Sequence, residues 1–150
     1  MADTTYMKNV VEPWVRTWLA QQFPGHRFSK QFLELNANFQ SVPGKHEFDA
    51  VSADKSIVAA IKGHSWKTSG GNLPSGKYAQ LYQELYFLSL VKATQKFLIL
   101  THEEMYNDFQ KRSQGKIAEG IRILFCELPH EVEEKVASMQ VRASKEQKPQ

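Results

Sequence analysis

Residues 96–101, KFLILT, constrain the fold of this chain more than any other segment. Four consecutive apolar side chains, Phe97 to Leu100, leave this short run without a polar face. A strand of this composition has to be covered on both sides, as are the interior strands of sheets that lie between helices. The segments on either side, about 75–92 and 101–112, have the periodicity and first-turn acids of helices. We therefore predict an α/β domain whose mixed sheet is flanked by helices.

Further segments extend this pattern along the whole chain. The predicted elements are a helix at 6–22, strands at 27–35, 47–53 and 56–62, a strand at 121–126 and a helix at 129–141. The order is thus α-β-β-β-α-β-α-β-α, and the tight turn at 53–55 makes its two flanking strands an antiparallel hairpin. Pro13 favours a regular helix from about Glu12 onward. We expect residues 1–141 to form a single domain and the polar residues 142–150 to form a frayed tail.

Composition narrows the class of protein only moderately. A chain of 150 residues is most simply one domain, and a net charge of +3 is compatible with a nucleic-acid partner without proving one. The only cysteine, Cys126, provides neither a disulfide framework nor zinc-ligand pairs, and we interpret it as a buried core residue. No segment approaches the roughly 18 apolar residues of a membrane span, and the first residues lack the apolar core of a signal peptide. We expect a cytoplasmic protein without a membrane partner.

Two charges stand among the apolar residues of the predicted hairpin. Asp49 lies in the segment EFDAV and Lys62 closes the segment SIVAAIK. Strict alternation places Glu47, Asp49 and Val51 on one face of the strand and Phe48 and Ala50 on the other. If the register allows, Asp49 and Lys62 converge at one end of the sheet, where burial would require a partner, a metal ion or water. The alternative is a plain salt bridge, or two strand ends that face solvent.

The helix at 75–92 carries a carboxylate within its apolar stripe. The stripe consists of Leu81, Leu85, Leu88 and Val91. Glu84 falls inside the same arc and Gln80 lies one turn earlier at its edge. A carboxylate in such a stripe is seldom placed for packing, which favours a functional role. In the alternative orientation Tyr82 and Tyr86 point inward and Glu84 lies at the rim.

These residues resemble the motif of the PD-(D/E)xK nuclease superfamily, which has the restriction-endonuclease-like fold. The resemblance covers about residues 6–101 and rests on EFDAV, the turn, IVAAIK and the following helix with its glutamine and glutamate. It implies that Asp49 is the metal-binding acid of the second strand and Lys62 the lysine of the third. Ala60 departs from the pattern, because the second acid of the family stands there. Either this acid has migrated to Glu84, or the chain has lost catalysis and only binds nucleic acid or a protein.

With a migrated acid, the resemblance implies a DNA endonuclease that depends on Mg²⁺ or Mn²⁺. Asp49 and Glu84 would hold the ion, and Lys62 would position the attacking water or stabilise charge on the phosphate. The accessory candidates are Glu12, Glu47 and Gln80. Glu12 is alternatively a first-turn acid that the helix dipole favours. Many relatives act as dimers, so a homodimer is a further expected partner.

The loop after Lys62 is the predicted DNA contact. It is rich in glycine and serine and brings His64, Trp66, Lys67 and Lys77, which suit contacts to phosphates and stacking on a base. The alternative is a mobile surface loop with incidental charge. Residues 71–77 also fit G-x-x-x-x-G-K, but Tyr78 follows in place of serine or threonine. Nucleotide binding is therefore only a remote third hypothesis.

Overall fold

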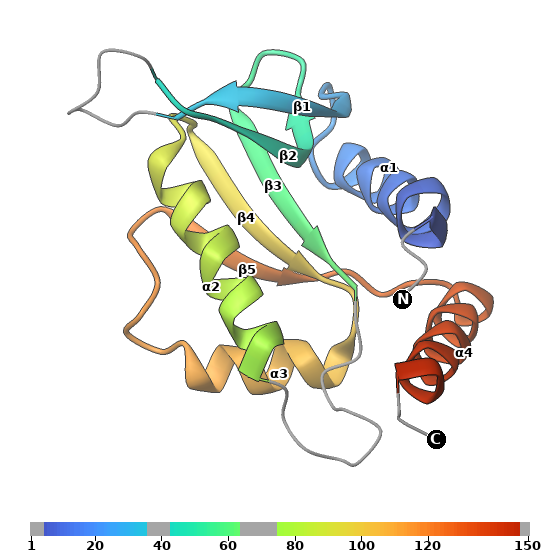
Figure 1. The fold of residues 1–150 in the computed structure, drawn as a ribbon. Helices are drawn as coiled ribbons and strands as arrows, with labels where there is room; N and C mark the ends of the chain where they lie inside the picture. Colours follow the sequence, from blue (N-terminus) through green and yellow to red (C-terminus); the bar gives the residue numbers. More distant parts are fainter. Residues whose placement is uncertain (1–4, 36–42, 64–74, 148–150) are drawn as a thin grey trace.

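The computed structural model describes residues 5–35, 43–63 and 75–147, and it confirms the predicted order of helices and strands (Figure 1). The elements are a π-helical turn η1 (Met7–Val11), α1 (Glu12–Gln22), β1 (Phe28–Glu34), β2 (Lys45–Ser52), β3 (Ile57–Lys62), α2 (Ser75–Leu90), β4 (Gln95–Leu100), α3 (Glu103–Arg112), β5 (Ile121–Phe125) and α4 (His130–Gln147). The five strands form one sheet in the order β1-β2-β3-β4-β5.

The sheet combines an antiparallel half with a parallel half. β1, β2 and β3 pair antiparallel as a meander, whereas β4 pairs parallel to β3 and β5 pairs parallel to β4. Each parallel pair needs a crossover connection, and α2 and α3 lie in these two connections. The predicted α/β class, with a mixed sheet flanked by helices, is confirmed.

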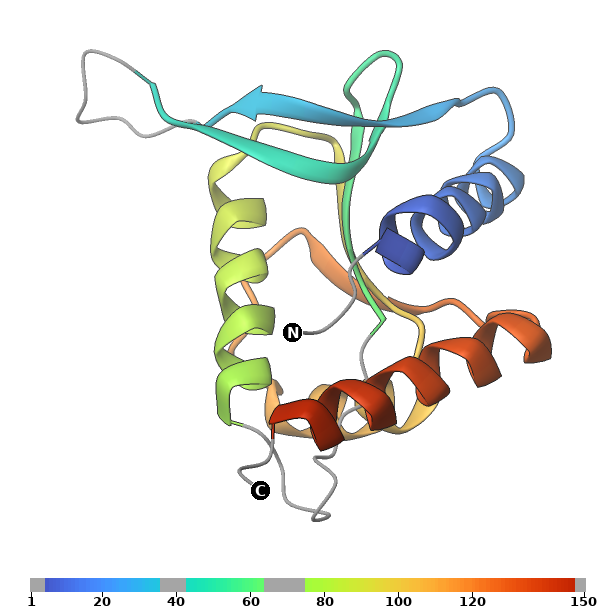
Figure 2. The same cartoon turned by 45° about the vertical axis from the view of Figure 1, so that its right-hand side comes forward.

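The sheet separates two hydrophobic cores (Figure 2). We call the cluster that α2 and α3 cover the α2-side core, and the cluster that η1, α1 and α4 cover the α1-side core. Leu98 and Leu100 of β4 belong to the α2-side core, whereas Phe97 and Ile99 belong to the α1-side core. All four are buried, which confirms that this apolar run is covered on both faces. Cys126 is buried in the α1-side core, as predicted.

Helix α2 packs with the predicted stripe toward the sheet. Its leucines Leu81, Leu85 and Leu88 are buried in the α2-side core, and Val91 follows them there. Tyr82 packs against the α2-side core, but Tyr86 is 60% exposed and does not point inward as the alternative rotation requires. Glu84, between two of these leucines, is therefore carried on the side of α2 that faces the sheet.

The structure confirms the predicted start of the first regular helix and corrects the predicted end of the last one. α1 begins at Glu12, as Pro13 led us to expect, but the π-helical turn η1 precedes it directly. α4 continues to Gln147, beyond the predicted end at Val141. Alanine, lysine, glutamate and glutamine in this last stretch are good helix formers, which explains why a polar segment extends the helix.

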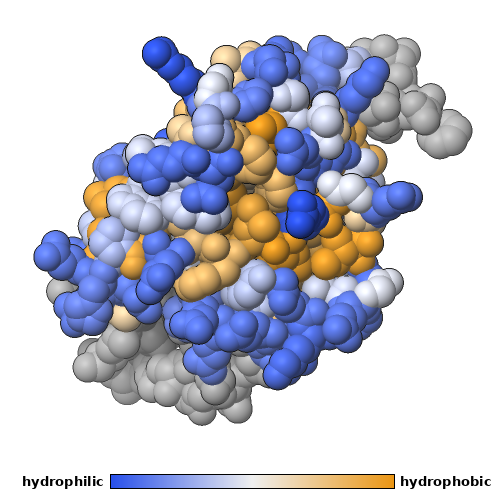
Figure 3. All heavy atoms as spheres, turned by 180° about the vertical axis from the view of Figure 1, so that it is seen from behind, coloured by the Kyte–Doolittle hydropathy of each residue, from blue (hydrophilic) through white to orange (hydrophobic). Residues whose placement is uncertain are grey.

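Seen from behind, the molecule shows apolar side chains gathered in the middle of its surface and hydrophilic ones around them (Figure 3). The α1-side core includes several aromatic residues that are only partly buried, namely Trp14, Trp18, Phe23 and Phe28. The aromatic residues at the outside of this core are thus partly exposed, whereas its strand residues are buried. Within the described ranges, no helix combines the length and the apolar character needed to cross a membrane.

The close approach at Gly63 generates a testable prediction about stability. A Cβ atom at Gly63 would lie 2.7 Å from Thr101 Oγ1 and 2.7 Å from Met7 Cε. Thr101 is buried and β-branched, so its side chain cannot easily rotate away. We expect Gly63→Ala to lower the free energy of unfolding by about 1–3 kcal/mol, measured by urea denaturation with circular dichroism.

Gly76→Ala is the matched control for this substitution. A Cβ atom at Gly76, in the first turn of α2, would meet nothing within 4 Å. Since alanine also favours helix over glycine, we expect unchanged or slightly raised stability. Equal loss of stability in both variants would show that Gly63 is not sterically required.

Candidate functional site

A β-bulge in β2 breaks the predicted alternation of side chains. The register of β1 against β2 shifts at this point, because two steps along β1 correspond to three steps along β2. Phe48 and Val51 consequently both pack in the α2-side core, whereas Ala50 packs in the α1-side core. The prediction that Phe48 and Ala50 share one face is therefore wrong. Bulges redirect side chains and are frequent next to active sites, and Asp49 lies in this one.

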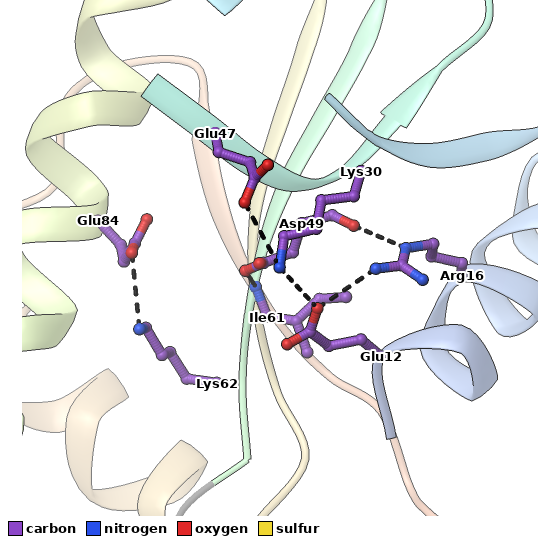
Figure 4. A network of polar contacts seen from close by, with 8 residues as sticks. All are labelled: Glu12, Arg16, Lys30, Glu47, Asp49, Ile61, Lys62 and Glu84. Atoms are coloured by element: carbon purple, nitrogen blue, oxygen red, sulfur yellow. Dashed lines mark hydrogen bonds and ion pairs between the residues drawn. The ribbon is translucent and has the colours of Figure 1, made fainter. Parts of the chain in front are cut away.

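β2 and β3 separate at the bulge, and we call this point the fork (Figure 4). β2 pairs with β3 over two residue pairs next to the turn, whereas β3 stays paired with β4 as far as Lys62. The backbone N–H of Ile61 donates instead to Asp49 Oδ2, at 2.8 Å. The backbone carbonyl of Asp49 accepts a hydrogen bond from Arg16 Nε, also at 2.8 Å. Both polar ends of Asp49 are thus fixed where the strands part.

The carboxyl of Asp49 is in an environment that disfavours its charge. Its pKa is raised from 3.8 to about 6, mainly by burial and in addition by the nearby carboxylates of Glu12 and Glu84. The Ile61 N–H and the Lys62 ammonium act in the opposite direction. Asp49 is therefore close enough to acids on both α1 and α2 to be repelled by each. A pKa shifted by burial and by specific charged neighbours is a recognised mark of functional sites.

Lys62 and Glu84 meet on the α2 side of the fork. Glu84 Oε1 lies 3.6 Å from Lys62 Nζ, and Glu84 Oε2 lies 3.4 Å from His46 Nε2. The Glu84 side chain is only 16% exposed. Ala60 is fully buried in the α2-side core and carries no polar group toward this place. His46 was not among the predicted site residues, although its position two residues before Phe48 indicates the same face of β2.

A second set of charges lies on the α1 side of the fork. Glu12 is buried, and its Oε1 lies 3.2 Å from Arg16 Nη2 and 3.5 Å from Lys30 Nζ. Lys30 Nζ is also 3.5 Å from Glu47 Oε1, so this ammonium joins the two acids (Figure 4). Arg16 and Lys30 were not identified from the sequence, because nothing local marks either residue as a neighbour of Asp49.

The remaining predicted site residues lie apart from the fork or outside the described residues. Gln80 is exposed on α2. Lys77 is half-buried in the first turn of α2, and this burial lowers its pKa. His64, Trp66 and Lys67 lie outside the described residues. The structure therefore gathers Asp49, Lys62 and Glu84 and adds His46 to them.

Asp49 and Glu84 are the two carboxylates at the fork that could hold a hard divalent ion. Within the described part of the chain, no group of three histidine, cysteine, aspartate or glutamate residues is arranged to hold a metal. Mg²⁺ usually takes only one or two carboxylates and completes its shell with water and substrate phosphates. A cation between Asp49 and Glu84 would also relieve the repulsion that raises the pKa of Asp49.

Comparison with known proteins assigns no family to this chain. It matches no protein-family model, no curated protein and no solved structure. We therefore argue its function from the residues at the fork.

The raised pKa of Asp49 predicts how stability depends on pH. The unfolded chain loses this proton near pH 3.8, whereas the folded protein keeps it up to about pH 6. Since the folded state binds the proton more tightly, Asp49 makes stability fall as the pH rises from about 4 to 6. The difference corresponds to at most about 3 kcal/mol. We expect Asp49→Asn, which still accepts from Ile61, to gain up to that amount at pH 7.5 in urea denaturation.

Asp54→Asn is a control of opposite sign. Asp54 Oδ1 accepts hydrogen bonds from Ser52 Oγ, Ser56 N and Ser56 Oγ in the turn between β2 and β3. The bonds to Ser56 are the main reason why the pKa of Asp54 is lowered to about 2. This stabilisation is present above pH 3.8 and is lost toward pH 2, so Asp54→Asn should destabilise at pH 7.5. A gain in stability from both substitutions would contradict the environment described for Asp49.

Proposed function

We propose that this domain is a divalent-metal-dependent DNA endonuclease of the PD-(D/E)xK type, with the restriction-endonuclease-like fold. The observation that carries the proposal is the contact between Lys62 and Glu84 beside Asp49 at the fork. A lysine and two carboxylates, brought together from β2, β3 and α2, are the groups that metal-assisted phosphodiester hydrolysis requires.

The position of Ala60 supports the migration of the second acid to α2. Ala60 and Lys62 are two residues apart on β3 and both point toward α2, since Ala60 packs in the α2-side core. An acid at position 60 would point toward the helix that carries Glu84. Glu84 instead reaches back from α2 and contacts Lys62. The carboxylate on this side of the sheet is thus supplied by α2 instead of β3.

Each residue at the fork has a role in the proposed reaction. Asp49 and Glu84 would hold Mg²⁺ or Mn²⁺, and the bound ion would polarise the scissile phosphate and acidify a bound water. Lys62, whose side chain is 24% exposed, orients the attacking water or stabilises the charge that develops on the phosphate. The hydrogen bond from Ile61 N–H keeps Asp49 from rotating out of the fork.

A second candidate function is a catalytically inactive nuclease-fold module that binds nucleic acid or a protein. It is favoured by the ion pairs of Glu12, Glu47 and Glu84, because cationic side chains of the chain itself already neutralise these acids. DNA, a homodimer partner and a cytoplasmic location remain predictions under both candidates.

Cleavage of supercoiled plasmid DNA tests the proposed function. With Mg²⁺ or Mn²⁺ we expect the protein to nick the plasmid, and we expect EDTA to abolish the activity. Asp49→Asn, Lys62→Met and Glu84→Gln should each lower the nicking rate by at least about 100-fold, because each removes a group that acts on the transition state. Gel electrophoresis of the plasmid forms over time measures these rates.

Substitutions of the same type on the exposed surface serve as controls. Lys111→Met and Glu119→Gln remove one positive and one negative charge from exposed residues, on α3 and after it. Both variants should leave the rate unchanged. Binding of DNA without cleavage under any divalent ion would establish the second candidate instead. Full activity of Glu84→Gln would refute the migrated acid even if the protein is a nuclease.

A further inference from the structure

The imidazole of His46 is held between two aromatic side chains. Its ring stacks on Phe87, with 3.9 Å between ring centroids and 9° between the planes. Phe48 meets it edge-on at 4.8 Å and 78°. Phe87 lies on α2, one turn after Glu84, so the same helix supplies the stacking partner and the acid. The direction in which His46 points is therefore determined by packing.

His46 Nε2 points at Glu84 from a buried position. This nitrogen is shielded from solvent and has no hydrogen-bond partner among the described residues. It lies 3.4 Å from Glu84 Oε2, within ion-pair distance but without hydrogen-bond alignment. Leaving a buried polar group unpaired is unfavourable, so a hydrogen bond to Glu84 would stabilise this arrangement. Since Glu84 Oε1 faces Lys62 Nζ at 3.6 Å, the carboxylate is held at both of its oxygens.

Glu84 benefits from such support because its side chain is long. A glutamate has several rotatable side-chain bonds, and fixing them costs conformational entropy. A rigid neighbour that restricts its rotamers reduces the cost of binding a ligand.

We propose that His46 is the positioning residue of Glu84, which fixes the Glu84 carboxylate toward Lys62 and thereby sets the affinity of the site for a divalent ion. This inference rests on the proposed function. His46 does not contact the reacting atoms, and its effect is transmitted entirely through Glu84.

A double-mutant cycle between His46 and Glu84 tests this role. Mn²⁺ affinity is measured from the electron paramagnetic resonance signal of free Mn²⁺, and plasmid nicking is followed in parallel. His46→Phe keeps an aromatic ring but removes Nε2, and we expect it to weaken Mn²⁺ binding about 10–100-fold. His46→Gln carries an amide nitrogen at a similar reach and should restore most of the affinity. In the Glu84→Gln background, His46→Phe should have no further effect.

The outcomes separate the positioning role from packing and from the proposed function. If His46→Phe weakens Mn²⁺ binding equally with and without Glu84, or leaves it unchanged, the positioning role is refuted while the nuclease proposal stands. If the wild-type protein neither binds Mn²⁺ nor nicks DNA, the proposed function fails and the positioning role fails with it. Should His46→Phe not fold, Phe87→Leu enters the cycle in its place. It loosens the imidazole without removing Nε2, and an Mn²⁺ affinity unchanged by it would overturn the role.

Discussion

The hydrogen bond from Ile61 N–H to Asp49 Oδ2 is the interaction on which the candidate site depends. It lets a side chain occupy the place of a backbone partner, so β3 can leave β2 without an unpaired donor. The strands separate there at little cost, and the opening they create is where Lys62 approaches the acids. If β2 and β3 stayed paired to their ends, backbone groups would fill the space in which the charged side chains now converge.

Charge around the fork is distributed unequally between the two faces of the sheet. On the α1 side, Arg16 and Lys30 neutralise Glu12 and Glu47 and tie α1 to β1 and β2. On the α2 side, Glu84 is held by Lys62 and His46. Asp49 lies between these groups, and its burial, together with the carboxylates of Glu12 and Glu84, makes its ionisation unfavourable. The fold thus supplies rigid, paired neighbours and leaves one carboxyl group under electrostatic strain, as expected where stability is exchanged for function.

The order of elements could be predicted from the sequence because hydrophobic periodicity is a local property. The apolar run at Phe97 to Leu100 and the stripe of α2 each identify their element and its buried face without reference to the rest of the chain. The bulge at Asp49 could not be predicted in this way, because it depends on the register between β1 and β2. Arg16 and Lys30 were missed for the same reason, since only the tertiary arrangement brings them to Asp49. His46 was missed although its place before Phe48 indicates its face of β2, because only the tertiary arrangement brings Glu84 of α2 to it.

The residues at the fork come from five separate elements. The two charged partners on the α2 side, Lys62 and Glu84, come from different elements. Glu84 arrives with the crossover helix, Lys62 with the strand before it, and Glu12 with the first helix of the chain. The site consequently exists only when α1, the meander and α2 are docked together. A partly folded chain that kept the sheet but released either helix would lose the constellation entirely. The presence of the assembled site therefore reports that α1, the meander and α2 have reached their native arrangement.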